Sequence, residues 1–153
     1  MGIPAYNDRS SLQGLLPHRG SMFLIERIAH FDRSGIECLT STHRDPHNPL
    51  RDASGLPVQA AIEYAAQAAG LHGGLLNRAV NPEAPPQRGY LAVISQLHWS
   101  VERLDDLPGP LRIRARRTAV TAGGRAYHVD VDHADSPILS GDLVIALMEP
   151  AAV

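Results

Sequence analysis

The longest helical pattern in the chain spans residues 57–77 and reads PVQAAIEYAAQAAGLHGGLLN. Ala, Gln, Leu and Glu are strong helix formers, and Pro57 suits the first position of a helix, so we predict a helix of about five to six turns. Its apolar residues are not confined to one stripe, which is typical of a helix enclosed by the rest of the protein. We therefore expect this helix to form the centre of the fold.

Strand patterns lie on both sides of the predicted helix. Two strands joined by a turn at residues 32–35 are expected before it, at 22–31 and 35–43. Four more are expected after it, at 90–101, 111–120, 126–133 and 138–148, with a tight turn at Gly123-Gly124. Ser10, Ser11 and Pro17 predict one short helix near the N-terminus. The order predicts a single α+β domain over residues 1–153, in which a curved antiparallel sheet wraps the long helix as in the hotdog fold.

The composition excludes several classes of protein. The formal net charge is −2 and no run of Lys and Arg is dense enough for nucleic acid or anionic lipid. Cys38 is the single cysteine, so a disulfide within the chain is excluded and a cytoplasmic location fits best. The N-terminus lacks the apolar stretch of a signal peptide, and Glu63, Gln67 and His72 interrupt the Ala-rich run. We expect a soluble protein.

Glu63 is the first candidate for chemistry, because it lies among Ala, Ile, Tyr and Val on the predicted helix. A carboxyl group in apolar surroundings has a raised pKa and can donate a proton to a leaving hydroxyl. Gln67 lies one turn further on and shares a face with Glu63, so it is placed to orient the carboxyl group. The alternatives are a solvated or hydrogen-bonded Glu63 on an exposed helix edge and a Gln67 that satisfies only backbone groups.

His47 is the candidate base, because it lies in the loop before the helix and its unperturbed pKa suits proton abstraction near pH 7. A solvated surface histidine is the alternative. The helix start at Pro57 and Val58 offers backbone N–H groups that polarise a thioester carbonyl if they face the same pocket.

No cofactor is expected. His43 and His47 are four residues apart, but Pro46 between them argues against a helical metal site. The chain also lacks a Gly-rich phosphate loop and the Gly-x-Ser-x-Gly elbow of serine hydrolases.

Two motifs resemble the β-hydroxyacyl-acyl-carrier-protein dehydratases of fatty-acid synthesis. Residues 16–27, LPHRGSMFLIER, are similar to the opening stretch of that family, and residues 62–70, IEYAAQAAG, look like its Glu-x-x-Ala-Gln motif. His47-Asn48-Pro49 is similar to the family's catalytic His-x-Pro element, which implies that His47 is the base and Glu63 the acid. The usual Pro-Gly at the helix start is Pro57-Val58 here, and the loop before it is longer.

The chain resembles more closely a divergent subgroup of these proteins that is associated with aryl-polyene and related pigment synthesis. Residues 50–55, Glu63 to Gln67 followed by His72-Gly73, and residues 103–107 carry this likeness. It implies a lyase that removes water from a 3-hydroxyacyl thioester on an acyl carrier protein to give a trans-2-enoyl thioester.

The resemblance also implies a dimer in which the histidine of one subunit faces the glutamate of the other. The partner is a second copy or a related hotdog subunit, and a higher oligomer is compatible with both. His18 is expected near the mouth of the site or the dimer seam, and His72 as a packed or hydrogen-bonded histidine. Two alternatives stay open: an acyl-thioesterase, and a non-catalytic hotdog subunit that supports an active dehydratase.

Overall fold

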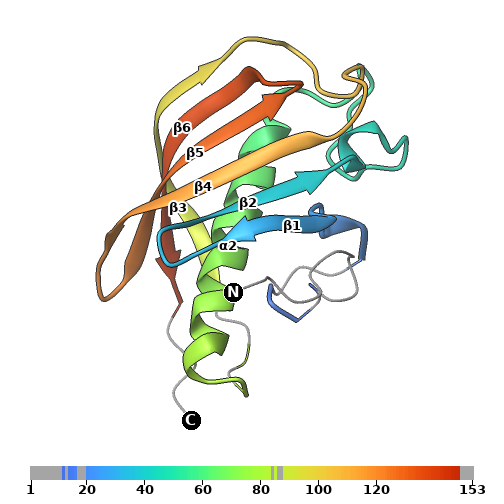
Figure 1. The fold of residues 1–153 in the computed structure, drawn as a ribbon. Helices are drawn as coiled ribbons and strands as arrows, with labels where there is room; N and C mark the ends of the chain where they lie inside the picture. The colour runs from blue at the N-terminus through green and yellow to red at the C-terminus, as the bar shows by residue number, and fades with distance from the viewer. Residues whose placement is uncertain (1–11, 13, 17–19, 84, 86–87, 149–153) are drawn as a thin grey trace.

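The structure is a computed structural model that describes residues 12, 14–16, 20–83, 85 and 88–148. One long helix lies against a six-stranded antiparallel sheet (Figure 1). The helix is α2, Ala60–Val80. The strands are β1 (Arg27–Phe31), β2 (Gly35–Thr40), β3 (Gly89–Trp99), β4 (Leu111–Val120), β5 (Gly124–His133) and β6 (Ser136–Leu147). This arrangement confirms the predicted hotdog architecture.

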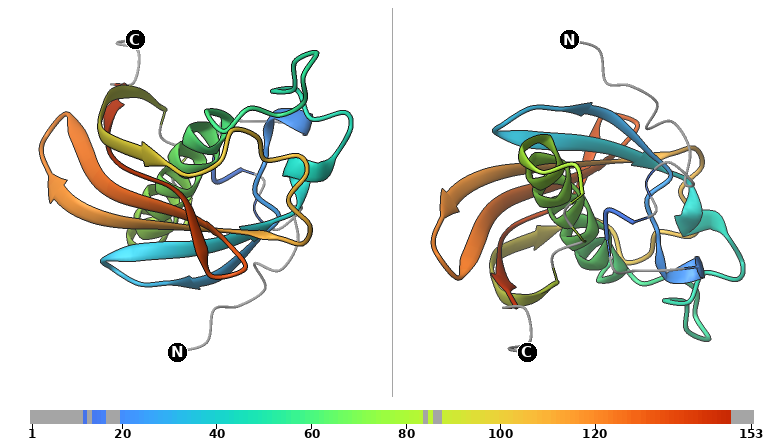
Figure 2. Two further views of the ribbon diagram at one scale, coloured as in Figure 1. Left: turned by 90° about the horizontal axis from the view of Figure 1, so that it is seen from above. Right: turned by 90° about the horizontal axis from the view of Figure 1, so that it is seen from below.

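The strands follow the order β1-β2-β4-β5-β6-β3, and every neighbouring pair is antiparallel. Figure 2 shows the sheet curving around α2, with the helix on its concave side. Alternation along β4 explains this burial: Leu111, Ile113 and Ala115 are buried, whereas the arginines between them are exposed. The concave face is thus the apolar face and forms the core with α2.

Helix α2 begins at Ala60, three residues later than predicted, and continues through Gly73 and Gly74 to Val80. Gly74 is required by a close approach, because a Cβ built there lies 2.8 Å from the backbone oxygen of Leu15. Gly74 therefore lets the segment at Leu15 pack against the helix without ending it.

The first predicted strand is shorter than expected. Residues 20–22 form a 3-10 turn, and β1 begins only at Arg27. Side chains satisfy the backbone in between: Gln67 Oε1 accepts from the Leu24 N–H at 2.9 Å, and the hydroxyls of Thr40 and Thr42 donate to the Leu24 carbonyl. These bonds take the place of strand pairing at this segment. Strand propensity does not predict them, because they come from side chains distant in the sequence. The predicted N-terminal helix at Ser10 and Ser11 lies outside the described residues.

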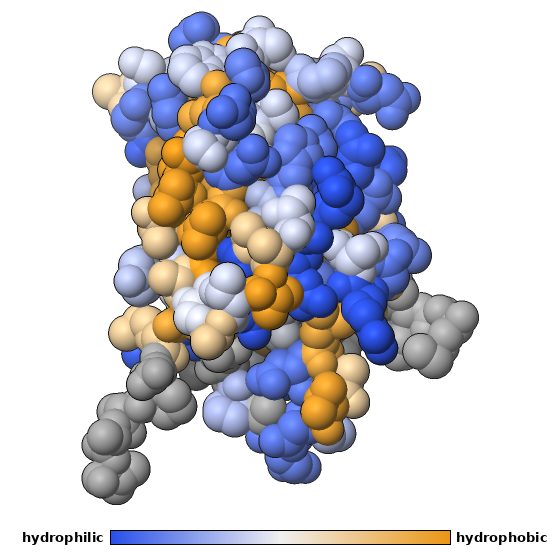
Figure 3. All heavy atoms as spheres, turned by 90° about the vertical axis from the view of Figure 1, so that its left-hand side faces the viewer, coloured by the Kyte–Doolittle hydropathy of each residue, from blue (hydrophilic) through white to orange (hydrophobic). Residues whose placement is uncertain are grey.

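β3 forms one free edge of the sheet and is exposed along most of its length. Its exposed side chains include four large apolar ones: Tyr90, Val93, Ile94 and Trp99. Figure 3 looks onto this side of the molecule and shows a band of apolar side chains among polar ones. A long apolar edge strand is a template for pairing with another chain.

Candidate active site

A cavity of about 300 Å³ lies between α2 and the concave face of the sheet. Its volume is at the lower end of the range for small-molecule sites, about 300–1,000 Å³. The helix contributes Glu63, Ala66, Ala69, Gly70, Gly73 and Gly74, the strands contribute Gly89, Tyr90, Leu91, Arg125, Tyr127, Ile145 and Leu147, and Leu16 completes the lining.

Glu63 is half-buried on the cavity wall, and Gln67 holds it. Gln67 Nε2 donates to Glu63 Oε1 at 3.1 Å and to the Met22 carbonyl at 2.7 Å, while its Oε1 accepts from the Leu24 amide. The Gln67 side chain is 1% exposed and its amide is used on both sides. Gln67 thus satisfies backbone groups and also contacts Glu63, so the alternative that it satisfies backbone groups alone is wrong. Of the alternatives for Glu63, a fully solvated side chain is wrong, whereas a hydrogen-bonded one is present.

The helix face beside Glu63 is made of small residues. Ala66, Gly70 and Gly73 follow it at three- and four-residue steps, so they lie in a line along the same face of α2. Larger side chains there would fill the space between helix and sheet. The composition of this face therefore leaves the cavity open along the helix axis.

His47 is exposed and is not among the residues that line the cavity. Its neighbour Asn48 is buried and anchored, because Asn48 Nδ2 donates to the Thr42 carbonyl at 2.9 Å and to the Tyr64 hydroxyl at 3.0 Å. This anchor ties the loop to α2 beside Glu63 while His47 faces away from the core. One chain thus does not bring His47 and Glu63 together.

The helix start differs from the prediction. Pro57 pairs with Arg103 in an isolated β-bridge, and the Val58 amide donates to the Glu102 carbonyl at 2.9 Å. Pro57 is therefore not the first helical residue, and the expectation of an unpaired Val58 N–H is wrong. The physical reason is that the loop between β3 and β4 packs on this segment and takes up its donor.

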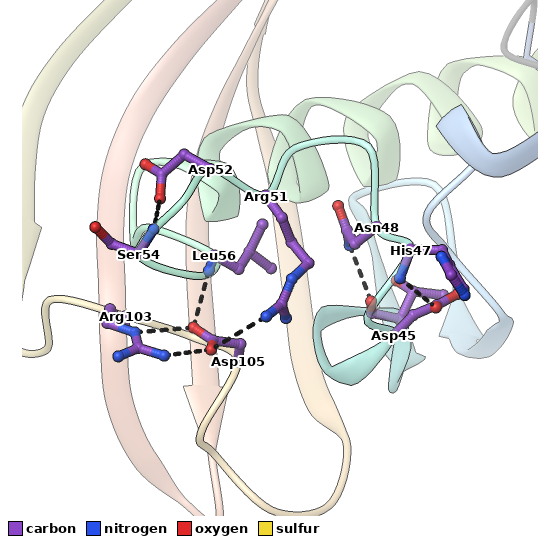
Figure 4. Close-up of polar contacts among 10 residues, drawn as sticks. Asp45, His47, Asn48, Arg51, Asp52, Ser54, Leu56, Arg103 and Asp105 are labelled. Atoms are coloured by element: carbon purple, nitrogen blue, oxygen red, sulfur yellow. Dashed lines mark hydrogen bonds and ion pairs between the residues drawn. The ribbon is translucent and has the colours of Figure 1, made fainter.

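A buried carboxylate joins these two loops. Figure 4 shows Arg51 and Arg103 reaching Asp105 from either side. Arg103 Nε donates to Asp105 Oδ1 at 3.1 Å, Arg51 Nη2 lies 3.8 Å from Oδ2, and the Leu56 amide donates to Oδ1 at 2.9 Å. The bonds from Arg103 hold the pKa of the Asp105 carboxyl well below its usual range, so it stays ionised. This cluster holds the segment between His47 and α2 in place.

A second buried pair lies at the other end of the cavity. His72 Nε2 is 2.8 Å from the Asp32 carbonyl, which only accepts, so this nitrogen carries the proton and Nδ1 accepts from the Tyr127 hydroxyl at 2.7 Å. Burial lowers the pKa of His72 and raises the pKa of Tyr127 to about 12. His72 is thus the packed, hydrogen-bonded histidine that was expected, and the pair is neutral.

The cavity residues of β5 were not predicted from the sequence. Arg125 and Tyr127 lie two apart, in phase with the buried Val129 and Val131. This alternation is readable in the sequence and places a cation on the apolar face. A charged residue in phase with apolar ones is the sequence signal that singles out Arg125.

The remaining expectations concern His18, a metal site and a membrane span. His18 lies outside the described residues. Within the described part of the chain, no group of three or more His, Cys, Asp or Glu side chains is placed to hold a metal ion. No helix among the described residues is long and apolar enough to cross a membrane.

The comparisons with known proteins agree with the fold. The model of the ApeP-like family, described as ApeP dehydratase, matches residues 10–152. No curated relative matches the sequence. The dehydratase heterocomplex ApeI:P from Xenorhabdus doucetiae superposes with a TM-score of 0.79 at 22% identity, over 90% of this chain and 91% of that one.

Thioesterases share the fold at greater distance. A thioesterase from Staphylococcus aureus, solved as a mutant, has a TM-score of 0.58 at 11% identity, over 80% of this chain and 92% of that one. A hypothetical thioesterase from Streptococcus pneumoniae, solved with coenzyme A, has a TM-score of 0.55 at 12% identity, over 82% and 88%. These likenesses show the hotdog fold alone, whereas the family model covers nearly the whole sequence: the chain belongs to the ApeP-like dehydratase family.

Proposed function

We propose that the protein is a 3-hydroxyacyl-acyl-carrier-protein dehydratase of the aryl-polyene type. The observation that carries the proposal is the Glu63 carboxyl group on the wall of the cavity, oriented by Gln67. An oriented carboxyl group on the wall of this cavity suits proton transfer to a leaving hydroxyl. The family to which the chain belongs supports dehydration over hydrolysis.

The proposed reaction removes water in one elimination. His47 takes the proton from the carbon next to the thioester carbonyl, the electrons of that bond form the new double bond, and the bond from C3 to its hydroxyl breaks. Glu63 gives its proton to the departing hydroxyl, which leaves as water. The Val58 amide takes no part, because the Glu102 carbonyl occupies it.

His47 acts in this scheme on a substrate held by another subunit. Support comes from its exposure and from the anchored Asn48 beside it. The free edge of β3, with exposed Val93, Ile94 and Trp99, is the surface on which that subunit docks. The partner is a second copy of this chain or a related hotdog subunit, and the relative in the ApeI:P heterocomplex supports the latter.

The first test replaces Glu63 with Gln, which keeps the shape of the side chain and removes the acid. We expect turnover of a 3-hydroxyacyl carrier-protein substrate to fall about 100-fold or more, as is typical for loss of a general acid. The enoyl product is measured by its absorbance. Free thiol is measured in the same sample. Glu83→Gln, at an exposed glutamate outside the cavity, is the matched control.

The assay separates the rival functions. Thiol release without enoyl product identifies a thioesterase. Activity that arises only after a related subunit is added, and is indifferent to Glu63→Gln, identifies a supporting subunit. Full activity of the folded Glu63→Gln variant by itself rules out Glu63 as the acid.

A further inference from the structure

Arg125 is a cation on a face that is otherwise apolar. Residues of β5 alternate, and Arg125 falls in phase with Tyr127, Val129 and Val131, which are buried against the helix side of the sheet. It faces Ile145 across the β5–β6 ladder, and both residues line the cavity. A charged side chain in such a position conflicts with the packing pattern, and such conflicts concentrate at functional sites.

The contacts of Arg125 leave part of its guanidinium free. Nη1 donates to the Thr121 carbonyl at 2.7 Å and to the Gly124 carbonyl at 2.8 Å, which fixes the group at the turn between β4 and β5. In the described part of the chain, no carboxylate lies within 4.0 Å of it, and Nε and Nη2 have no hydrogen-bond partner. Arg117, paired with Tyr127 across the β4–β5 ladder, adds a second positive charge nearby.

Arg125 and Glu63 mark opposite ends of the cavity. Tyr127 meets the helix at His72, nine positions after Glu63, which is about 14 Å along the axis at 1.5 Å per residue. Arg125 lies two residues before Tyr127, at the start of β5 next to the β4–β5 turn. Between the two ends the walls are apolar or small: Ala66, Gly70, Leu91 and Ile145.

We propose that the acyl chain of the substrate lies along α2 and that Arg125 binds an oxygen-bearing group at its far end, a phenol or a carboxylate. This inference rests on the proposed function, since it takes Glu63 as the reacting end. An apolar chain fits the apolar walls of the cavity. An oxygen atom at its end accepts hydrogen bonds from Arg125 Nε and Nη2. A plain alkyl end would offer no acceptor to Arg125 Nε and Nη2.

The experiment measures binding, so it does not depend on turnover. Three 2-enoyl pantetheine amides of equal length, in which an amide replaces the thioester, end in a methyl group, a 4-hydroxyphenyl group or a carboxylate. Isothermal titration calorimetry gives the Kd of each for the wild-type protein in its native oligomeric state. We expect at least one oxygen-bearing analogue to bind about tenfold or more tightly than the methyl analogue, as for hydrogen bonds to charged groups.

Arg125→Met should abolish that preference, with the methyl analogue bound at least as tightly as by the wild type, and Arg125→Lys should restore part of the preference. Arg116→Met removes an exposed arginine from the neighbouring strand and serves as the matched control. Equal binding of all three analogues by the wild type, no binding of any, or an equal effect of both Met variants overturns the proposal. A preference that persists in a protein without dehydratase activity supports this site and refutes only the proposed reaction.

Discussion

Two buried histidines make the stability of the protein depend on pH. His43 and His72 are both fully buried, and burial lowers the pKa of each below its usual value. Each uses Nε2 to donate to a carbonyl, of Leu107 and of Asp32 respectively. His43 Nδ1 has no partner among the described residues, so that ring is held neutral by its surroundings.

We expect the free energy of unfolding to fall between pH 7.5 and 5.5. Below about pH 6.5 the histidines bind protons in the unfolded protein, whereas their lowered pKa keeps them neutral in the folded protein. The free energy of unfolding therefore declines by up to about 1.4 kcal/mol per pH unit for each residue. The carboxylates with lowered pKa values, Asp32 and Asp105, lose their contribution only at more acidic pH. Urea unfolding at several pH values measures the slope.

His98→Gln, at an exposed histidine of β3, should keep the wild-type slope, whereas His72→Gln should reduce it. Constant stability over this pH range would show that the two rings have the same pKa in the folded and the unfolded protein, which would contradict the effect of burial. The burial of two side chains is thus measurable in the stability of the whole protein.

At the scale of elements, the loop before α2 depends on the loop after β3. The Leu56 and Leu104 backbones are bonded to each other, and Asp105 joins Arg51, Arg103 and the Leu56 amide. The segment carrying His47 is thus bound to a part of the chain more than forty residues away. Its geometry follows from these contacts, because residues 45–59 form no regular helix or strand of their own.

Asp105→Asn removes the charge and keeps the shape of the side chain. We expect a loss of about 1–3 kcal/mol in stability, the usual range for a buried hydrogen bond to a charged group. The Leu56 and Leu104 amides should exchange faster with deuterium, and turnover should fall as the His47 loop loosens. Asp106→Asn, at the exposed neighbour, is the control. Unchanged exchange at both amides would show that backbone pairing alone holds the loops.

At the scale of the whole molecule, the separation of His47 from the cavity is the decisive feature. Within one chain the loop anchor at Asn48 and Tyr64 keeps His47 on the outside. If a second copy completes the site, each site contains one His47 and one Glu63 from different subunits. That arrangement makes a prediction about mixtures of variants.

His47→Gln and Glu63→Gln, each inactive alone, should regain activity when they are unfolded together and refolded as mixed dimers. Half of the dimers are then mixed and hold one intact site of two, so about a quarter of wild-type turnover is expected for a symmetric dimer. Mass determination by light scattering establishes the dimer, and each variant refolded by itself is the control. Mixtures that stay as inactive as their components would contradict a site shared between two copies.

Local patterns in the sequence were sufficient for the main elements. The bounds of β4 agree with the prediction, and α2 and the remaining strands after it agree within a few residues, because alternation and helix propensity are properties of neighbouring residues. The Glu63–Gln67 bond also follows from helical spacing alone. The α+β class and the pairing of Glu63 with Gln67 in the first two turns of α2 were therefore accessible without coordinates.

Contacts between distant segments were not accessible in this way. The late start of β1 depends on Gln67 reaching Leu24, the engaged Val58 amide depends on Glu102, and the cavity depends on α2 meeting β5 and β6. Each joins residues far apart in the chain, and no periodicity within a segment reports on them. The helix and its acid come from local chemistry, whereas the channel, its Arg125 end and the outward His47 come from the way the sheet closes around that helix.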